Sequence, residues 1–479
     1  MPNYDLLATR GMLLPPRADA NPAVALYWTG DTSTDPTAVA NWSESDGGGD
    51  ASDTPDSNDS VSFTGSGNND CTLTEDEEWG TVDIASGYTA TLDLNDHDLT
   101  LGNGQDFTAA GGGTVDCGSG TISLTNGSFD NSQQTTWTHG GGKVAMGGVG
   151  TLTSPNTTVL GALEILSGAT VTCADSTGMQ GALDVDGEFL IASGKLAQVS
   201  TSNGKTSIGS AGRLGGDGTL RIDAWAAGSG ITSFAAGGTI DVAELQLARP
   251  NAAAEFAVGT YSSTRVVVYN WTDAGYTLTL SATPGSGYVF SGDLEFENTN
   301  AGASSAITIA NDTNDPDLTL QGDVIWTPTA GTLTYTAGTG TVTFSGASDQ
   351  DIDFGGSTIE DVIVDKSAGT LTFSADCDPA SITQTAGAIH VTNGLTITVP
   401  GNAVFHDDLI GDGGSFDLDV SGTNVAHDCT ITNVHSIGTV LDATDNCIDG
   451  GGNVNVNFGV AATTTSRLSP LGVAMTSAA

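Results

Sequence analysis

The chain alternates apolar and polar residues in short runs that recur along most of its length. From about Thr81 to Phe458, Thr, Val, Ile and Leu alternate between interruptions of Gly, Asn and Asp, as at 81–84, 121–124 and 341–344. Alternation with a period of two places one face of a strand in a core and the other face in water. Runs with helical periodicity are almost absent. The pattern therefore predicts many very short strands separated by turns.

Composition narrows the fold class. The 66 glycines among 479 residues, with abundant Ser, Thr, Asn and Asp, provide turns between such strands. Aromatic residues are only 6% of the chain, which predicts a thin core. We therefore predict an all-β fold, a parallel β-solenoid (β-helix) or stacked β-modules, with extended N- and C-terminal peptides. Alternation alone does not fix strand direction, so a string of small antiparallel β-sandwiches is the alternative. Turn signals recur too often for strands of sandwich length, which favours the solenoid.

Changes in composition divide the chain into six predicted regions. Prolines, and apolar residues that need cover, mark the N-terminus as a docking arm, held by another subunit or, alternatively, folded back on its own chain. Trp28 and Trp42 precede an alternating strand, and we expect this module to cap the open end of the solenoid. The regions are an extended docking arm (1–27), a β cap module (28–79), a first β-solenoid region (80–245), an irregular β transition (246–290), a second β-solenoid region (291–458) and an extended C-terminal tail (459–479).

The charge balance argues against nucleic acids as partners. The chain carries 57 acidic and 11 basic residues, a formal net charge of −46. A field this negative repels phosphate backbones, so we expect no nucleic-acid binding, and it also disfavours direct contact with anionic membranes. Asp far outnumbers Glu, and we expect these acids in turns, where divalent cations could bridge them.

The first ten residues have neither the apolar core nor the small-residue cleavage site of a signal peptide. Nowhere does the chain hold a run of about 18 apolar residues, the length that a membrane-spanning helix requires. We therefore expect a protein that is made and assembled in a cytoplasm and does not insert in a membrane.

Two segments resemble known families. The pattern Trp28-Thr-Gly, Asn41-Trp-Ser and Pro55–Phe63 is similar to the start of repeats in autotransporter-like β-helical passenger regions. The segments 428–434 and 443–453 resemble the ends of β-helical structural proteins of tailed phages. The second resemblance implies a virion component, namely a tail fibre, a spike or a capsid-surface appendage. Its partners would be other virion proteins and copies of itself, docked through the terminal peptides, and a host-surface glycan or receptor.

Two other functions stay open. A cell-surface adhesin or surface-layer protein would suit the same fold, although a signal sequence would have supported it better. A glycan-degrading tailspike would need two close carboxylates in a groove with aromatic walls. Asp351, Asp353 and Asp361 flank one Gly-Gly turn, and Asp407 and Asp408 follow His406.

Neither group of acids is assigned a role. With 57 acids in the chain, some carboxylates lie close together by chance. Lyase chemistry also favours a cation beside the proton that is removed, and the region 267–465 holds one basic residue, Lys366. We predict a non-enzymatic protein and assign no catalytic residue.

No cofactor or metal site is assigned either. Calcium is the ligand that the composition favours most, through the acidic turns 93–98 and 312–317, but neither has EF-hand spacing and both are typical of turns. His427 and His435 lie beside Cys429 without a zinc spacing. Glycines 212, 215, 216 and 218 around Arg213 lack the nucleotide-binding spacing and indicate corners between strands.

The six cysteines are scattered, without a Cys-x-x-Cys pair. Four of them are expected to be small buried residues. Cys429 and Cys447 stand in similar contexts, 18 residues apart (429 to 447), which is close to one coil of a solenoid. We expect them to stack on successive coils, and whether they form a disulfide stays open.

Overall fold

The computed structural model describes residues 22–459, apart from residue 135 and the segments 156–158, 201–204, 224–229, 249–254, 258, 271–274, 281–286, 300–305 and 312–314. The chain divides into two compact units, residues 1–142 and 143–479, and each is described by itself. The described residues form strands and one short 3-10 helix, η1 (Val39–Asn41). Most of the predicted docking arm and of the C-terminal tail lies outside the described residues.

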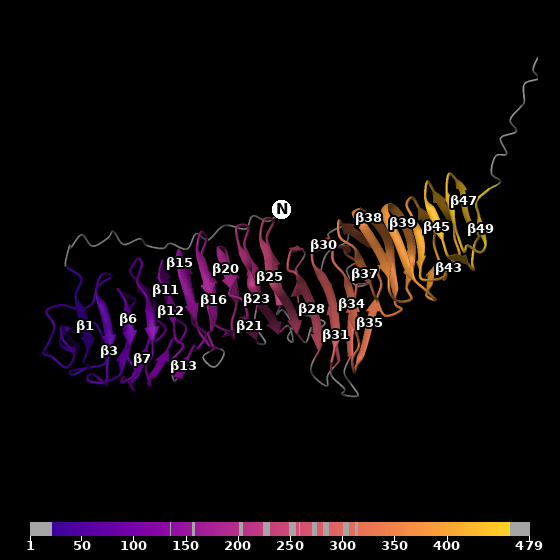
Figure 1. The fold of residues 1–479 in the computed structure, drawn as a ribbon. Coiled ribbons are helices and arrows are strands. Elements are labelled where there is room, and N and C mark those ends of the chain that lie inside the picture. Colours follow the sequence, from indigo (N-terminus) through magenta and orange to yellow (C-terminus); the bar gives the residue numbers. More distant parts are fainter. Residues whose placement is uncertain are drawn as a thin grey trace, which may run out of the picture. The chain divides into compact units, whose positions relative to one another are not determined.

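The first unit winds through three parallel sheets in turn (Figure 1). Face one holds β1 (Ala25–Trp28), β3 (Ser60–Phe63), β6 (Val82–Ile84), β9 (Phe107–Ala109) and β12 (Phe129–Asp130). Face two holds β4 (Cys71–Thr72), β7 (Thr91–Asp93), β10 (Thr114–Asp116) and β13 (Thr136–Thr138). Face three holds β5 (Glu77–Trp79), β8 (Leu99–Leu101) and β11 (Thr121–Thr125). Each strand pairs in parallel with the strand one coil later, as Val82 does with Phe107.

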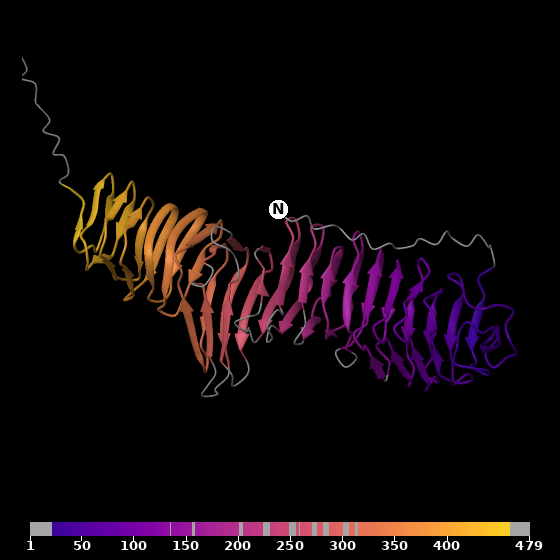
Figure 2. The same cartoon turned by 180° about the vertical axis from the view of Figure 1, so that it is seen from behind.

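The second unit repeats this arrangement over more coils, as Figures 1 and 2 show from opposite sides. Face one holds β15 (Val149–Thr153), β17 (Thr170–Cys173), β20 (Glu188–Ile191), β27 (Thr260–Tyr261), β30 (Gly287–Phe290), β33 (Asp317–Leu320), β36 (Thr341–Gly346), β41 (Ala403–Phe405), β44 (Asn424–His427), β47 (Leu441–Asp445) and β49 (Val456–Asn457). Face two holds β18 (Thr177–Met179), β21 (Leu196–Ser200), β28 (Arg265–Asn270), β31 (Asp293–Asn298), β34 (Val324–Thr327), β37 (Gln350–Ile352), β42 (Leu409–Asp412), β45 (Thr430–Thr432) and β48 (Ile448–Gly451).

Four long strands bend from face one into face two of this unit. They are β23 (Arg213–Asp223), β25 (Thr239–Ala248), β38 (Thr358–Phe373) and β39 (Asp378–Thr392). Face three holds β14 (Lys143–Gly147), β16 (Ala162–Ile165), β19 (Leu183–Val185), β22 (Lys205–Ile208), β24 (Gly230–Phe234), β26 (Glu255–Phe256), β29 (Gly275–Thr279), β32 (Ala306–Ala310), β35 (Thr332–Thr336), β40 (Thr396–Val399), β43 (Phe416–Val420) and β46 (Val434–Ser436).

The predicted parallel β-solenoid is confirmed, with about 16 turns over the two units. The alternative of antiparallel sandwiches is wrong, because the described strands of both units pair in parallel, except where β1 meets β2 (Trp42–Ser43). The predicted transition 246–290 contains β28, which pairs in parallel with β25 before it and with β31 after it.

Several acidic residues lie at corners between strands. There a carboxylate accepts a hydrogen bond from a backbone N–H of the following coil: Asp76 from Asp98 (3.0 Å), and Asp98 in turn from Thr121 (2.7 Å). Asp293 accepts from the N–H of Asp323 (3.0 Å) in the same way. A corner leaves an N–H without a ladder partner, and an ionised acceptor satisfies it strongly. Much of the excess of Asp is therefore structural.

The interior of the first unit ends in an aromatic cluster. Trp28 and Trp42 are buried and meet edge to face with ring centroids 5.1 Å apart, and Trp79 lies 5.8 Å from Trp42. The indole N–H of Trp42 donates to the carbonyl oxygen of Pro36 (2.7 Å). Strand β2 pairs with the edge of β1 that faces away from β3, so the parallel ladder does not end in an open edge there.

The coils of the second unit differ in size. Tyr261 lies opposite Phe290, and Phe290 opposite Leu320, so these coils take 29 and 30 residues (261 to 290 and 290 to 320). Larger coils need larger side chains inside, and Phe256, Tyr261, Tyr288 and Phe290 stack there with centroids 4.8–6.5 Å apart. An apolar void of about 20 Å³ remains beside them. Its size and lining make it a packing defect that stays dry.

Candidate functional site

A polar groove of about 450 Å³ crosses the second unit where face one turns into face two. Four successive corners line it, and each ends at the start of a face-two strand. The lining residues are Ser262, Ser263, Thr264, Ser291, Gly292, Asp293, Gln321, Gly322, Asp323, Ser348 and Asp349. Successive parallel strands lie about 4.8 Å apart. Four corners therefore extend over roughly 14 Å, which is the length of a short chain of polar residues or sugars.

At two corners of the groove the backbones of successive coils pack so closely that only glycine fits. A Cβ atom at Gly292 would collide with the carbonyl oxygens of Ser263 and Thr264, and one at Gly322 would collide with the backbone of Gly292. The same dipeptide, Gly-Asp, occupies 292–293 and 322–323. At each of these corners a residue without a side chain is therefore followed by a carboxylate. Ser263 is fully buried and its hydroxyl has no hydrogen-bond partner within the described chain.

The groove is electrostatically negative with one cation beneath it. Burial, and then the Asp293 and Asp351 carboxylates, raise the pKa of Asp323, although the backbone N–H of Asp351 donates to it (2.8 Å) and opposes the shift. Lys366 is buried under the corner and donates to the carbonyl oxygen of Ser348 (2.7 Å) and to Gln350 Oε1 (2.7 Å). Burial lowers the pKa of Lys366, against the attraction of Asp349 and Asp323.

The chemistry of this lining suits hydrogen bonding to a polar ligand. Hydroxyls, carboxylates and backbone groups can exchange hydrogen bonds with a hydroxyl-rich ligand. The described residues of the lining include no His, Cys or aromatic residue, and the amine of Lys366 is already engaged below the surface. The groove thus offers hydrogen-bond donors and acceptors to a ligand.

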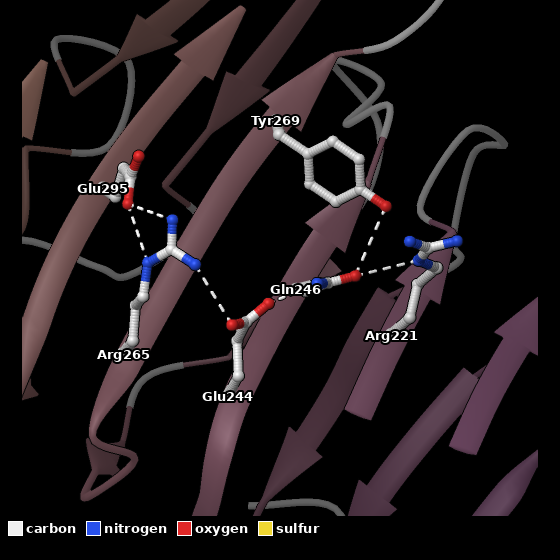
Figure 3. Close-up of polar contacts among 6 residues, drawn as sticks. All are labelled: Arg221, Glu244, Gln246, Arg265, Tyr269 and Glu295. Carbon is white, nitrogen blue, oxygen red and sulfur yellow. Dashed lines mark hydrogen bonds and ion pairs between the residues drawn. The ribbon is translucent and has the colours of Figure 1, made fainter. Parts of the chain in front are cut away.

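A second polar feature, on the outer side of face two, is a ladder of charges (Figure 3). Arg265 reaches both neighbouring coils: its Nε donates to Glu295 (2.7 Å) and its Nη1 to Glu244 (3.1 Å). On face one, Arg213 bridges Asp241 (2.8 Å) and Glu188 (3.3 Å) of its two neighbouring coils in the same way. Each arginine is also the ladder partner of one of the acids that it binds: Arg213 lies opposite Glu188, and Arg265 lies opposite Glu244. The acids that these two arginines neutralise lie on the coils of β20, β25 and β31, and each arginine lies on the coil between two of them.

The ladder continues through polar side chains towards the preceding coil. The amide of Gln246 donates to Glu244 and its oxygen accepts from Arg221 Nε (2.9 Å) and from the Tyr269 hydroxyl (3.4 Å). The Arg221 guanidinium also lies 5.5 Å from the centroid of the Tyr269 ring. Because these groups satisfy one another, we interpret the ladder as a link between coils.

One carboxyl has a pKa typical of a general base. Burial raises the pKa of Glu77 to about 7, helped by Glu75 and Asp35 and opposed by a hydrogen bond from the Trp79 indole (3.3 Å). The Glu77 side chain contacts the buried Trp79 indole, and it lines neither the groove nor the void. Geometry therefore does not support a catalytic role for Glu77.

The structure separates two of the acids that were considered for glycan cleavage and left without a role, Asp351 and Asp361. Asp351 lies on face two in β37, whereas Asp361 lies in the face-one part of β38 and accepts from the Ser381 hydroxyl (2.7 Å). Asp353 accepts from the N–H of Gly355 (2.6 Å), two residues further on, which is a turn contact.

Asp407 and Asp408 also serve the backbone. Asp407 accepts from the N–H of Gly387 (2.9 Å), and Asp408 from that of Thr430 (2.8 Å). His406 stacks its ring on that of His427, with centroids 4.9 Å apart. None of these contacts brings two carboxylates to one cavity.

Four histidines, His97, His390, His427 and His435, pair with acids of an adjacent coil. His427 lies 2.8 Å from Asp445, and His435 lies 2.8 Å from Asp417. In the part of the chain that the structure covers, no group of three or more His, Cys, Asp and Glu could hold a metal ion. The acids of 93–98 accept backbone N–H groups, and residues 312–314 of the other acidic turn lie outside the described residues. The expectation of no cofactor, with calcium as the open alternative, stays a prediction.

Arg213 and its glycines form a corner, as expected, within strand β23. The groove residues were missed, because Ser, Thr, Gly and Asp are common in every turn of this sequence. The sequence feature that could have indicated these residues is the repeat of the dipeptide Gly-Asp at 292–293 and 322–323, one coil apart.

No family model, no curated protein and no solved structure matches this chain in the comparisons made with them. No described helix has the length and hydropathy needed to cross a membrane.

Proposed function

We propose that this chain is a non-enzymatic structural subunit of a virion, built into a tail fibre, spike or capsid-surface appendage. The observation that carries the proposal is the parallel backbone ladder that continues from coil to coil within each unit. Such ladders make a stiff body, and loops at the corners are free to vary in sequence. The terminal peptides would dock on neighbouring subunits. The placement on a virion rests on the resemblance of 428–434 and 443–453 to phage β-helical proteins.

Immunogold electron microscopy tests this proposal. An antibody raised against the purified full chain is applied to particles and cells from the native source, with antibody pre-absorbed on the chain as the control. We expect gold on particle heads or tails. Gold restricted to the cell envelope would contradict the virion proposal and favour an adhesin or surface-layer protein.

The polar groove favours a second role for the same subunit, which is contact with a surface glycan. Its hydroxyl, amide and carboxylate groups match the hydrogen-bonding groups of sugars. Its negative charge would repel anionic polysaccharides, so a neutral glycan is the expected ligand.

Replacing Asp323 with Asn should weaken glycan binding at least about tenfold, since hydrogen bonds to a charged group contribute roughly 1.5–3 kcal/mol. Asn keeps an oxygen for the N–H of Asp351, so the corner should still form. Calorimetry with neutral oligosaccharides measures the change, and Asp449→Asn, outside the groove, is the matched control. Equal affinity in both variants would argue against the groove, and release of new reducing ends would contradict a non-enzymatic role.

A further inference from the structure

The last coils of the second unit bring two cysteines into direct contact. Cys429 Sγ lies 3.1 Å from Cys447 Sγ, and both are free thiols in this structure. The following residues, Thr430 and Ile448, are partners in the parallel ladder between β45 and β48. The N–H of Ile448 also donates to the carbonyl oxygen of Cys429 (2.8 Å). The thiols therefore stand on successive coils, as their spacing predicted.

This geometry is already that of a disulfide precursor. Neighbouring parallel strands lie about 4.8 Å apart, within the roughly 4.4–6.8 Å that the Cα atoms of a disulfide span. The sulfurs would need to approach to about 2.05 Å, which side-chain rotation can provide without moving the strands. A second contact fixes the same corner, because the Asn446 amide donates to Asp428 (2.7 Å).

The cysteine pair lies in the last described coils, where a disulfide would stabilise strands that have few other contacts. β48 and β49 each pair with one earlier strand among the described strands, β45 and β47. Ile437, Val440, Ile448 and Val454 expose 46–64% of their surface in these last coils. A terminal coil with few buried contacts opens more readily than an interior coil.

We propose that Cys429 and Cys447 form a redox-controlled cross-link that locks the terminal coil of the second unit onto the coil before it. The oxidant would be a low-molecular-weight disulfide, which the reaction reduces to two thiols. Cys447 is partly exposed and Cys429 is buried, so the small disulfide reaches Cys447 first.

The steps balance as thiol–disulfide exchange. The Cys447 thiolate attacks one sulfur of the small disulfide, which forms a mixed disulfide and releases one small thiolate. Cys429 then gives up its proton to water and its sulfur attacks Cys447 Sγ, which releases the second small thiolate. Burial, and then Cys447 and the nearby acids, raise the pKa of Cys429, so this second step is the slower one.

The other cysteines supply an internal control. Burial raises the pKa of Cys117 to about 12 and that of Cys173 to about 11. In the ladder Cys173 stands opposite Leu152 and Ile191, and Cys71 opposite Leu92. Both pairings leave these thiols without a cysteine partner on the next coil.

The test uses the full chain, treated with oxidised glutathione and then alkylated, digested without reduction and analysed by mass spectrometry. We expect one cross-linked peptide that contains Cys429 and Cys447, while the other four cysteines carry the alkyl label. A stable glutathione adduct on Cys447, or cross-links between chains, would overturn the proposal.

Hydrogen exchange of β47–β49 tests the locking itself on the same samples. Oxidation should slow exchange of these amides at least about tenfold relative to the reduced chain, because opening the coil then requires breaking or stretching the cross-link. The Cys429→Ser and Cys447→Ser variants should show no change on oxidation. Equal exchange in the oxidised and reduced wild-type chain would refute the locking role.

Discussion

Replacing Glu360 with Ala should lower the free energy of unfolding of the second unit by about 3–5 kcal/mol. Glu360 is fully buried, and its carboxyl accepts from Asn311 Nδ2 (2.6 Å), from the N–H of Gly338 (2.8 Å) and from the Tyr335 hydroxyl (2.9 Å). The variant would leave three buried donors without that acceptor and would open a cavity at a corner of the coil. Urea unfolding followed by circular dichroism measures the loss.

The adjacent residue provides the matched control. Asp361 is exposed on the same strand and its one side-chain contact given by the structure is the bond from Ser381. Asp361→Ala should therefore cost less than about 1 kcal/mol. Glu360→Gln, which keeps one acceptor oxygen, should fall between the two. If Glu360→Ala and Asp361→Ala unfold alike, the buried network does not stabilise the unit.

Replacing Trp42 with Ala should destabilise the first unit by about 3–5 kcal/mol, the usual cost of removing a buried aromatic side chain. The change removes the edge-to-face contacts with Trp28 and Trp79 and leaves the carbonyl oxygen of Pro36 without its indole partner. It also loosens β2, which covers the edge of β1. An uncovered strand edge pairs with other chains, so we expect concentration-dependent association as well.

Two measurements separate these effects. Hydrogen exchange of β1 and β3 reports the local loss of stability, and light scattering at several protein concentrations reports association. Trp42→Phe keeps a ring in the cluster and should lose only about 1–2 kcal/mol without association. Unchanged exchange in Trp42→Ala would show that the aromatic cluster does not hold this end of the unit.

The acidic residues show how far sequence reasoning reached. It placed the acids in turns, and Asp76, Asp98 and Asp293 do lie at corners. It did not predict what these carboxylates bind, because each accepts a hydrogen bond from an N–H of the following coil, more than twenty residues away. The same limit hid the groove, whose four corners become neighbours only once the coils stack.

The lengths of the coils decided which other contacts could be predicted from the sequence. Cys429 and Cys447 could be placed on successive coils from their spacing because the final coils are short, as the partners Val425 and Asp442 indicate. Glu360 gave no such signal: its partners Asn311 and Tyr335 come from earlier coils of different lengths.

Alternation and frequent turns were enough to predict short strands with one buried face, because burial of alternate residues is a local property of a strand. Strand direction, the register of each coil and the neighbours of every corner followed only from the folded molecule. The physical reason is that a contact between coils depends on the summed lengths of all the turns between its two residues. An inserted or deleted turn residue changes that sum while leaving the alternating pattern of each strand intact.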